Sequence, residues 1–222
     1  MELTKSQHKV IEQVINCFET SRIDGNYSAV ALLADSPTKT KQVTYGRSQV
    51  TEFGNLKALL QSYHGEYATE LAQYIPKIRD GSLASNIAFI TLLKNAGKDP
   101  VMQACQDAIF DEHYFKPAER WADSMGFTLP LSMLVIYDSY IHSGKVRDSL
   151  RESFAEKVPA SGGDEKRWVV AYCHARRNWL EHADNPLLHA TVYRMDCCLS
   201  LASLGNWDLN ARPIMAHGVM IR

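Results

Sequence analysis

Residues 18–56 read FETSRIDGNYSAVALLADSPTKTKQVTYGRSQVTEFGNL, and they contain the one convincing β pattern of the chain. Two short runs of strand-forming residues, 28–33 and 42–48, flank a polar loop. In that loop Asp35 precedes a Ser-Pro pair, which is a turn signal because proline fixes φ and an aspartate can bond to its own turn. We therefore predict one small hairpin or sheet within residues 27–50.

Helices are expected on both sides of this hairpin. Apolar residues recur at helical spacing over residues 4–18, where Thr4 is a candidate N-cap. This helix would present Glu19 at its C-terminal end. Residues 51–63 repeat the helical pattern, with Thr51 as a candidate cap.

The remainder of the chain carries one helical pattern after another, at residues 67–78, 83–93, 101–125, 129–142, 146–158, 164–182 and 186–204. Pro117 should divide the third of these helices. The run at 129–142 is strongly apolar, as in a helix at the centre of a core. Residues 205–222 read as an irregular tail. The expected fold class is therefore mainly α, and residues 1–222 should form a single domain with two lobes and a cleft between them.

The composition is that of an ordinary globular protein. Of the 222 residues 45% are hydrophobic and 22% are charged, and the formal net charge is −1. A nucleic-acid-binding protein would need a basic patch, so we expect no nucleic-acid partner. No run approaches the ~18 apolar residues of a membrane span. Because the first twenty residues are too charged for a signal-peptide core, we expect export by a route without a visible N-terminal signal, export after a signal was removed, or a cytoplasmic protein.

Cofactor and metal sites are not indicated by the sequence. The five cysteines include no CxxC pair, which favours buried free thiols over disulfides or a zinc site. The eight histidines are scattered, without the motifs of a metal centre. GxSxG, P-loop and GxGxxG motifs are missing, so serine-hydrolase and nucleotide-binding functions lack support.

Glu19, Asp35 and Thr44 suggest acid–base chemistry on a glycosidic bond. Such a reaction needs one protonated carboxyl group to donate to the leaving oxygen, and an ionised one to activate water or to stabilise positive charge on the sugar. A threonine hydroxyl can position that water. The alternative is structural, with Glu19 as a solvated surface residue, Asp35 as a turn residue and Thr44 as a strand former.

Two arginines lie inside predicted helices among apolar neighbours. Arg176 and Arg194 each need a carboxylate partner if they are buried. Such a pair could orient a catalytic glutamate and influence its pKa. The alternative is purely structural ion pairing with Asp138, Asp196 or Glu181.

Several short stretches match one known family in their order and spacing. They are FETS (18–21), VTYG (43–46), IYDSYIHSG (136–144), VPASGGDEKRW (158–168), AYCHAR (171–176), Tyr193-Arg194 and LGNWDLN (204–210). The C-terminal stretches are the most specific, since the family has Pro-Ala-x-Gly-Gly-Asp-Glu, Ala-Phe-Leu-Asp-Ala-Arg and Gly-Asn-Leu-Asp-Leu-Asn there. Together these matches resemble the chitosanases of glycoside hydrolase family 46, within the lysozyme-like superfamily.

This resemblance implies a two-lobed, lysozyme-like catalytic domain that hydrolyses the β-1,4 links of chitosan with inversion and without a cofactor. It also implies roles for individual residues. Glu19 is the general acid, Thr44 helps to place the attacking water, and Arg176 and Arg194 support the catalytic glutamate.

The first departure from the family concerns the base. Where the family has its base aspartate, this chain has Lys39. We therefore expect Asp35 to be the base, with Asp24 and Glu52 as substitutes.

The second departure concerns the substrate. Asn55 stands where the family has a sugar-binding aspartate. Because chitosan is a polycation, the loss of an acidic group leaves room for peptidoglycan and a muramidase activity. An inactive saccharide-binding module is a further alternative. We group Asn55 with Asp24, Arg47, Arg176 and Arg194 as residues expected to bind or support the substrate.

Overall fold

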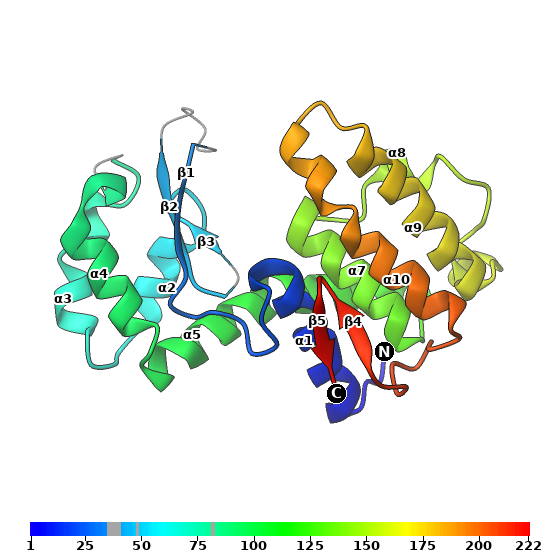
Figure 1. The fold of residues 1–222 in the computed structure, drawn as a ribbon, viewed down its shortest axis with the longest axis horizontal. Coiled ribbons are helices and arrows are strands. Elements are labelled where there is room, and N and C mark those ends of the chain that lie inside the picture. Colours follow the sequence, from blue (N-terminus) through cyan, green and yellow to red (C-terminus); the bar gives the residue numbers. More distant parts are fainter. Residues whose placement is uncertain (35–40, 48, 81–82) are drawn as a thin grey trace. The chain divides into compact units, whose positions relative to one another are not determined.

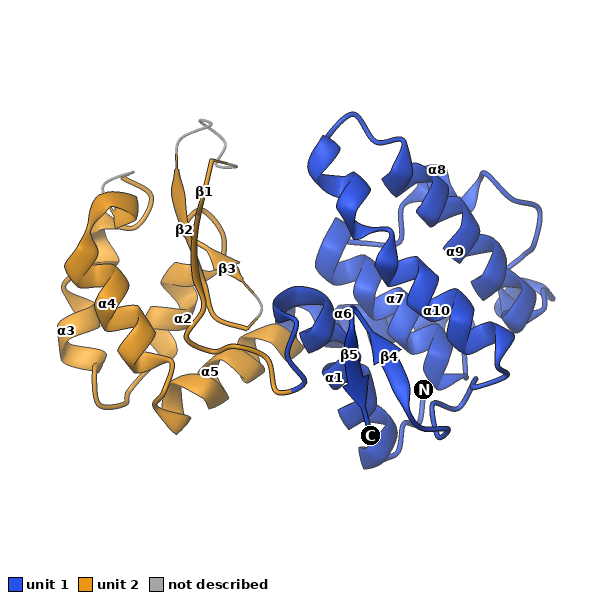
Figure 2. Cartoon of the chain, viewed as in Figure 1, with its two compact units in different colours: residues 1–23, 112–222 blue, residues 24–111 orange. Residues whose placement is uncertain are grey.

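A computed structural model describes residues 1–34, 41–47, 49–80 and 83–222, and most of its elements are helices (Figure 1). The chain divides into two compact units (Figure 2). Residues 1–23 and 112–222 form the first unit, and residues 24–111 form the second. The second unit is thus one continuous segment that follows the first helix of the chain.

The predicted hairpin lies in the second unit, as part of a three-stranded antiparallel sheet. Its strands are β1 (Val30–Leu33), β2 (Gln42–Tyr45) and β3 (Val50–Thr51), in the order β1-β2-β3. Thr44 of β2 is opposite Ala31 on one side and Thr51 on the other. The prediction of Thr51 as a helix cap is wrong, because its backbone pairs with β2 and the next helix begins only at Leu56.

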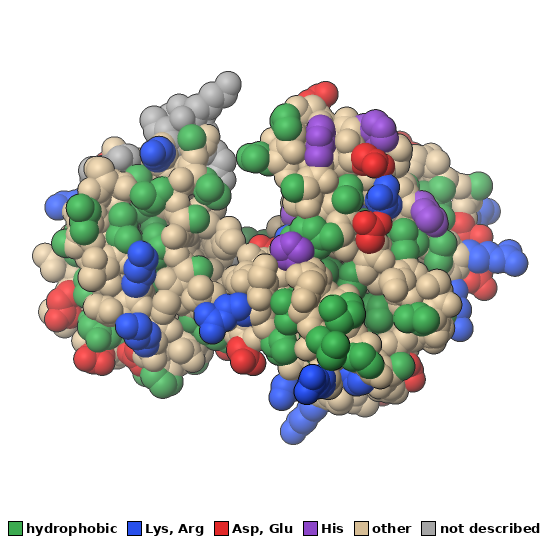
Figure 3. Space-filling model, viewed as in Figure 1, with side chains coloured by type: hydrophobic (Ala, Val, Ile, Leu, Met, Phe, Trp, Pro, Cys, Tyr) green, Lys and Arg blue, Asp and Glu red, His purple; other side chains and the backbone are tan. Residues whose placement is uncertain are grey.

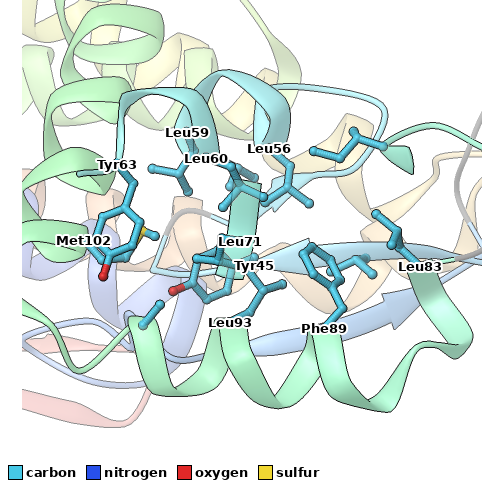
Figure 4. Close-up of a cluster of buried hydrophobic side chains, with 14 residues drawn as sticks. Tyr45, Leu56, Leu59, Leu60, Tyr63, Leu71, Leu83, Phe89, Leu93 and Met102 are labelled. Carbon is cyan, nitrogen blue, oxygen red and sulfur yellow. The ribbon is translucent and has the colours of Figure 1, made fainter. Parts of the chain in front are cut away.

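Helical segments complete the second unit: α2 (Leu56–Ser62), α3 (Ala68–Ala72), η1 (Ile75–Lys77), η2 (Leu83–Ser85), α4 (Ile87–Ala96) and α5 (Pro100–Phe110). Asn86 and Asp99 begin α4 and α5, because each side chain accepts a hydrogen bond from a backbone N–H in the first turn. Apolar side chains of these helices pack with Val43 and Tyr45 of the sheet in one buried core (Figure 4). This core fixes β2, which carries Thr44.

The first unit is built around α7 (Pro130–Ser143). Its other helical segments are α1 (Lys5–Thr20), the π-helical turn η3 (Asp111–Phe115, shared at its first residue with the second unit), α6 (Lys116–Ser124), α8 (Asp148–Arg151), η4 (Pro159–Ser161), α9 (Glu165–Glu181), η5 (Pro186–Thr191) and α10 (Tyr193–Ser203). α7 is buried along most of its length and contacts α1, α6, α9 and α10, which confirms the central helix predicted there. Thr4 caps α1 in a reciprocal capping box with Gln7, as predicted.

The C-terminal tail is a hairpin, so the prediction of an irregular tail is wrong. β4 (Ile214–Ala216) and β5 (Val219–Ile221) pair antiparallel and contact α1, and β4 also contacts α10 (Figure 1). The two residues between them, His217 and Gly218, have φ of 47° and 77°. Positive φ at both central positions matches the twist of a two-residue hairpin, and glycine tolerates it without strain.

Two other sequence expectations meet different outcomes. Of the helix expected over residues 146–158, only α8 forms. All five cysteines are unpaired thiols, and all are buried except Cys105, which is partly buried.

Over the described parts of the chain, every helix is too short or too polar to cross a lipid bilayer. On the face drawn in Figure 3, described side chains of both charge signs are interspersed over each unit.

Candidate active site

Glu19 lies at the C-terminal end of α1, which ends at Ser21 with φ of 55°. Its side chain is only 13% exposed, and Arg194 Nη2 of α10 donates to Oε1 at 2.7 Å. This ion pair confirms the prediction that a helical arginine lies within hydrogen-bond reach of Glu19. The surface position considered as the alternative for Glu19 is therefore not observed.

A chain of buried charges continues from this pair. Arg194 Nη1 also donates to Asp138 Oδ1 at 2.7 Å, and Arg176 Nη1 donates to Asp138 Oδ2 at 2.5 Å. Ser139 Oγ accepts a further hydrogen bond from Arg176 at 3.2 Å. The order Glu19, Arg194, Asp138, Arg176 alternates in sign, so each buried charge has an opposite neighbour.

The electrostatics of this chain follow from burial and proximity. Burial alone raises the pKa of the Asp138 carboxyl, but the two guanidinium groups outweigh it and hold the pKa below its ordinary value. Burial lowers the pKa of Arg194, but Asp138 and Glu19 together raise it above its ordinary value. Both shifts favour the charged forms of the two groups.

Aromatic rings lie against the Arg194 guanidinium that pairs with Glu19. The Arg194 guanidinium lies over the rings of Phe18 and Tyr193, at 5.5 and 5.7 Å from their centroids. The pKa of Tyr114 is raised first by burial and second by the charge of Glu19, which places Tyr114 near this carboxylate. Glu19 thus has both a cationic partner and aromatic side chains in its surroundings.

Thr44 lies in β2 of the second unit and is 2% exposed. Within the described ranges its Oγ1 has no hydrogen-bond partner. A buried hydroxyl without a partner is unusual, and a bound water is one of its ordinary explanations. The side chain therefore suits the placement of a water molecule.

The remaining predicted residues have different surroundings. Asp24 is exposed, and Asn55 is partly exposed at the start of α2, where it makes no capping bond through its side chain. Arg47 is 4% exposed and pairs with Asp107 at 2.7 Å. Arg47 is thereby built into the contact between the sheet and α5. Asp35 falls outside the described residues.

Glu52, named above as a substitute base, is fully buried. Its carboxylate accepts from the backbone N–H groups of Val43 and Arg79, both at 3.2 Å. Arg79 has φ of 79°, so this carboxylate fixes a strained turn against the sheet. These bonds occupy both oxygens of Glu52 and identify it as a structural group.

Sequence reasoning considered Asp138 only as a structural partner, whereas it links both arginines. Its place in the middle of an apolar helix was the available signal, since a buried carboxylate must be paired. The other two candidate partners, Asp196 and Glu181, pair with Arg177 instead.

Among the residues that the structure describes, no group of three or more His, Cys, Asp or Glu side chains could hold a metal ion.

Comparisons with known proteins point to one family. The family model for glycosyl hydrolase family 46 matches residues 13–214. The chain is 28% identical over 233 residues to a chitosanase of Bacillus subtilis (strain 168), across 94% of this chain and 81% of that protein. It is 30% identical over 137 residues to a chitosanase of Streptomyces sp. (strain N174), across 56% of this chain and 49% of that protein.

Solved structures with the same fold carry bound saccharides. One is an E19A mutant chitosanase from Bacillus subtilis MY002 complexed with 6 GlcN, with 25% identity, a TM-score of 0.85 and complete coverage of both chains. Another is a chitosanase of Gynuella sunshinyii in complex with chitotetraose, with 25% identity, a TM-score of 0.82 and coverage of 99% of this chain and 98% of that one. These likenesses confirm the mainly α, lysozyme-like fold class predicted from the sequence.

Proposed function

The chain belongs to glycosyl hydrolase family 46 and is an endo-acting glycoside hydrolase, and we propose that it cleaves the β-1,4 links of chitosan with inversion. The observation that carries the proposal is the Glu19–Arg194 ion pair, continued through Asp138 to Arg176. A partly buried carboxyl group that an arginine orients at a helix end suits a general acid, because the arginine stabilises the carboxylate left after donation.

In the proposed reaction Glu19 gives its proton to the glycosidic oxygen as the bond from that oxygen to the anomeric carbon breaks. A carboxylate on the opposite face of the sugar takes a proton from water, whose oxygen bonds to the same carbon. The products are a free hydroxyl on one sugar and an α-hemiacetal on the other. Arg194 stabilises the carboxylate that remains on Glu19 after donation.

Thr44 is proposed to hold the attacking water, because its buried hydroxyl has no partner in the described part of the chain. Glu19 belongs to the first unit and Thr44 to the second. An inverting pair of carboxyl groups is typically ~6.5–9.5 Å apart, which leaves room for the water.

Asp35 is the proposed base, and Asp24, which is exposed, is its substitute. Asp35→Asn should lower turnover by at least ~100-fold if Asp35 is the base, since that is the scale of general acid–base catalysis. Normal turnover in this variant would transfer the role to Asp24, to be tested by Asp24→Asn.

Because chitosan is a polymer met outside cells, the proposal includes export of the protein.

The deciding experiment measures new reducing ends on chitosan and on peptidoglycan, with the intact protein and with Glu19→Gln. Glu19→Gln keeps the shape and removes the proton, so turnover should fall by at least ~100-fold with the unfolding temperature preserved. Glu152→Gln, at an exposed position of the same unit, is the matched control and should be fully active. NMR of the first product should show the α-anomer.

Other outcomes would change the proposal in specific ways. Near-normal activity of Glu19→Gln would overturn the acid assignment. Cleavage of peptidoglycan but not chitosan would favour a muramidase, which the asparagine at position 55 motivates. An intact protein without activity on either polymer, but with affinity for one, would be an inactive saccharide-binding module.

A further inference from the structure

The C-terminal end of α1 has backbone carbonyls that the helix itself cannot satisfy. A helix leaves its last four carbonyl groups without intrahelical partners. In α1 the Phe18 carbonyl is one of these, whereas the Cys17 carbonyl already accepts from the backbone N–H of Ser21 at 3.0 Å, and Glu19 projects from the same turn. This last turn has no basic residue of its own, so further donor groups for its carbonyls come from elsewhere in the fold.

Two segments far away in the sequence supply those groups. Tyr193, the first residue of α10, donates its hydroxyl to the carbonyl oxygen of Phe18 at 2.8 Å. His217, in the turn between β4 and β5, has Nδ1 at 3.3 Å from the carbonyl oxygen of Cys17. The same nitrogen lies 3.3 Å from Ser21 Oγ. The tautomer with its proton on Nδ1 can donate to the Cys17 carbonyl oxygen, and the other tautomer can accept from the Ser21 hydroxyl.

The two rings also hold each other. His217 stacks on Tyr193 with centroids 3.9 Å apart and planes 5° from parallel. The Tyr193 ring in turn meets Phe18 edge-on at 5.7 Å. His217 is an exposed residue, and its ring is held by this stack and by its contacts with Cys17 and Ser21. These contacts join the β4–β5 hairpin to the end of α1.

We infer that His217 and Tyr193 are positioning residues for the general acid: they lock the last turn of α1 and so set the direction of the Glu19 carboxyl. The inference rests on the proposed role of Glu19 and extends it. Arg194 orients the Glu19 carboxylate by an ion pair with one of its oxygens. His217 and Tyr193 instead hold the backbone from which the Glu19 side chain projects. A carboxyl group held at both ends is preorganised for proton donation.

Positioning predicts a particular kinetic signature. Small misplacements of a catalytic group cost up to ~100-fold in rate, because the reacting atoms must meet in a near-attack geometry. His217→Ala should therefore lower kcat by about 10-fold and leave KM within about two-fold, since substrate contacts are unchanged. Tyr193→Phe keeps the stack and removes only the hydroxyl, so its loss of kcat should be smaller.

Two further His217 variants separate the contributions of the ring. His217→Phe keeps the stack without the hydrogen bond, and His217→Gln keeps a donor without the stack. Each should recover part of the kcat that His217→Ala loses. Met220→Ala, an exposed change in the same hairpin, is the matched control and should keep full kcat. Unfolding temperatures of all variants are measured alongside.

The decisive readout is the combination with Glu19→Gln. If His217 acts through Glu19, His217→Ala should cause no further loss of the residual activity in the Glu19→Gln background. An equal fractional loss in both backgrounds, or normal kcat in both His217→Ala and Tyr193→Phe, would overturn the inference. If His217→Ala does not fold, the Tyr193→Phe and His217→Phe comparisons in the two backgrounds decide it. Full activity of Glu19→Gln alone would instead overturn the proposed function.

Discussion

His142 should make the protein lose stability between neutral pH and pH 4. It lies on α7 one turn after Asp138, close to the buried charges that support Glu19. Burial first and the charge of Arg194 second lower its pKa from 6.5 to about 4. Its Nδ1 is buried and has no hydrogen-bond partner in the described ranges, which agrees with an imidazole held neutral.

The sign and size of the effect follow from proton linkage. Between pH 6.5 and pH 4 this histidine is protonated in the unfolded chain but not in the folded chain. Proton binding therefore favours unfolding, and the free energy of unfolding decreases as the pH is lowered. The contribution is fully present above pH 6.5 and is lost as the pH approaches 4. A window of about 2.5 pH units at ~1.36 kcal/mol per unit gives about 3 kcal/mol from this one side chain.

Urea unfolding of the intact protein and of His142→Gln at pH 7.0, 5.5 and 4.0 measures this contribution. The intact protein should lose about 3 kcal/mol more than the variant over this range, whatever the variant costs at pH 7. His174→Gln, at an exposed position on α9, is the matched control and should follow the intact protein. Parallel pH dependences for the intact protein and His142→Gln would show that His142 is not held neutral in the fold.

Three further changes test interactions inside one unit or the other. Asp138→Asn leaves two buried guanidinium groups without their shared carboxylate, so urea unfolding should show a loss of about 3–5 kcal/mol, and chitosan hydrolysis by the folded fraction should slow as well. Arg47→Met should lower stability by about 1–2 kcal/mol and leave KM unchanged, because Arg47 pairs with the half-exposed Asp107 inside the second unit. Glu165→Ala removes an acceptor of hydrogen bonds from Thr128, Leu129 and Ser132 at the start of α7, so thermal unfolding should show a loss of about 2 kcal/mol with kcat per folded molecule retained.

The elements that the sequence predicts well are those whose signals are local. The capping box at Thr4 and the apolar spacing that follows it lie within one helix, and α1 forms as predicted. The apolar run of α7 needs no partner to be recognised as a core helix. Two strand-forming runs around a turn signal likewise suffice for the β1–β2 pairing.

The failures lie where a distant segment decides the outcome. Threonine is a residue type that often caps helices, but the backbone of Thr51 pairs with β2 and forms part of a third strand. The C-terminal hairpin is too short and too weakly alternating to be read as strands, and it forms where α1 and α10 offer an apolar surface. A His-Gly pair between apolar residues was its one local signal, since both positions accept positive φ.

The same distinction explains what could be foreseen of the site. A buried arginine needs a carboxylate partner, so an ion pair of Arg194 could be predicted from its apolar helical neighbours. The sequence alone could not decide between Glu19 and Asp138 as that partner. The structure gives it both, because a guanidinium has enough donors in a planar fork to serve two carboxylates at once. The stacking of His217 on Tyr193 has no sequence signal, because it depends on the register of a hairpin against two helices.

Glu19 is positioned by ion pairs, whereas Thr44 is positioned by backbone hydrogen bonds of the sheet. The direction of Glu19 depends on charges that stay paired only while α1, α7, α9 and α10 remain packed, so any loosening of this packing admits water to the ion pairs and weakens them. Thr44 is fixed by backbone pairing on both sides of β2, which depends little on charge or pH. Acid, salt or a cavity near α7 should therefore disturb Glu19 before Thr44, and so impair the proposed proton donation before the proposed placement of the water.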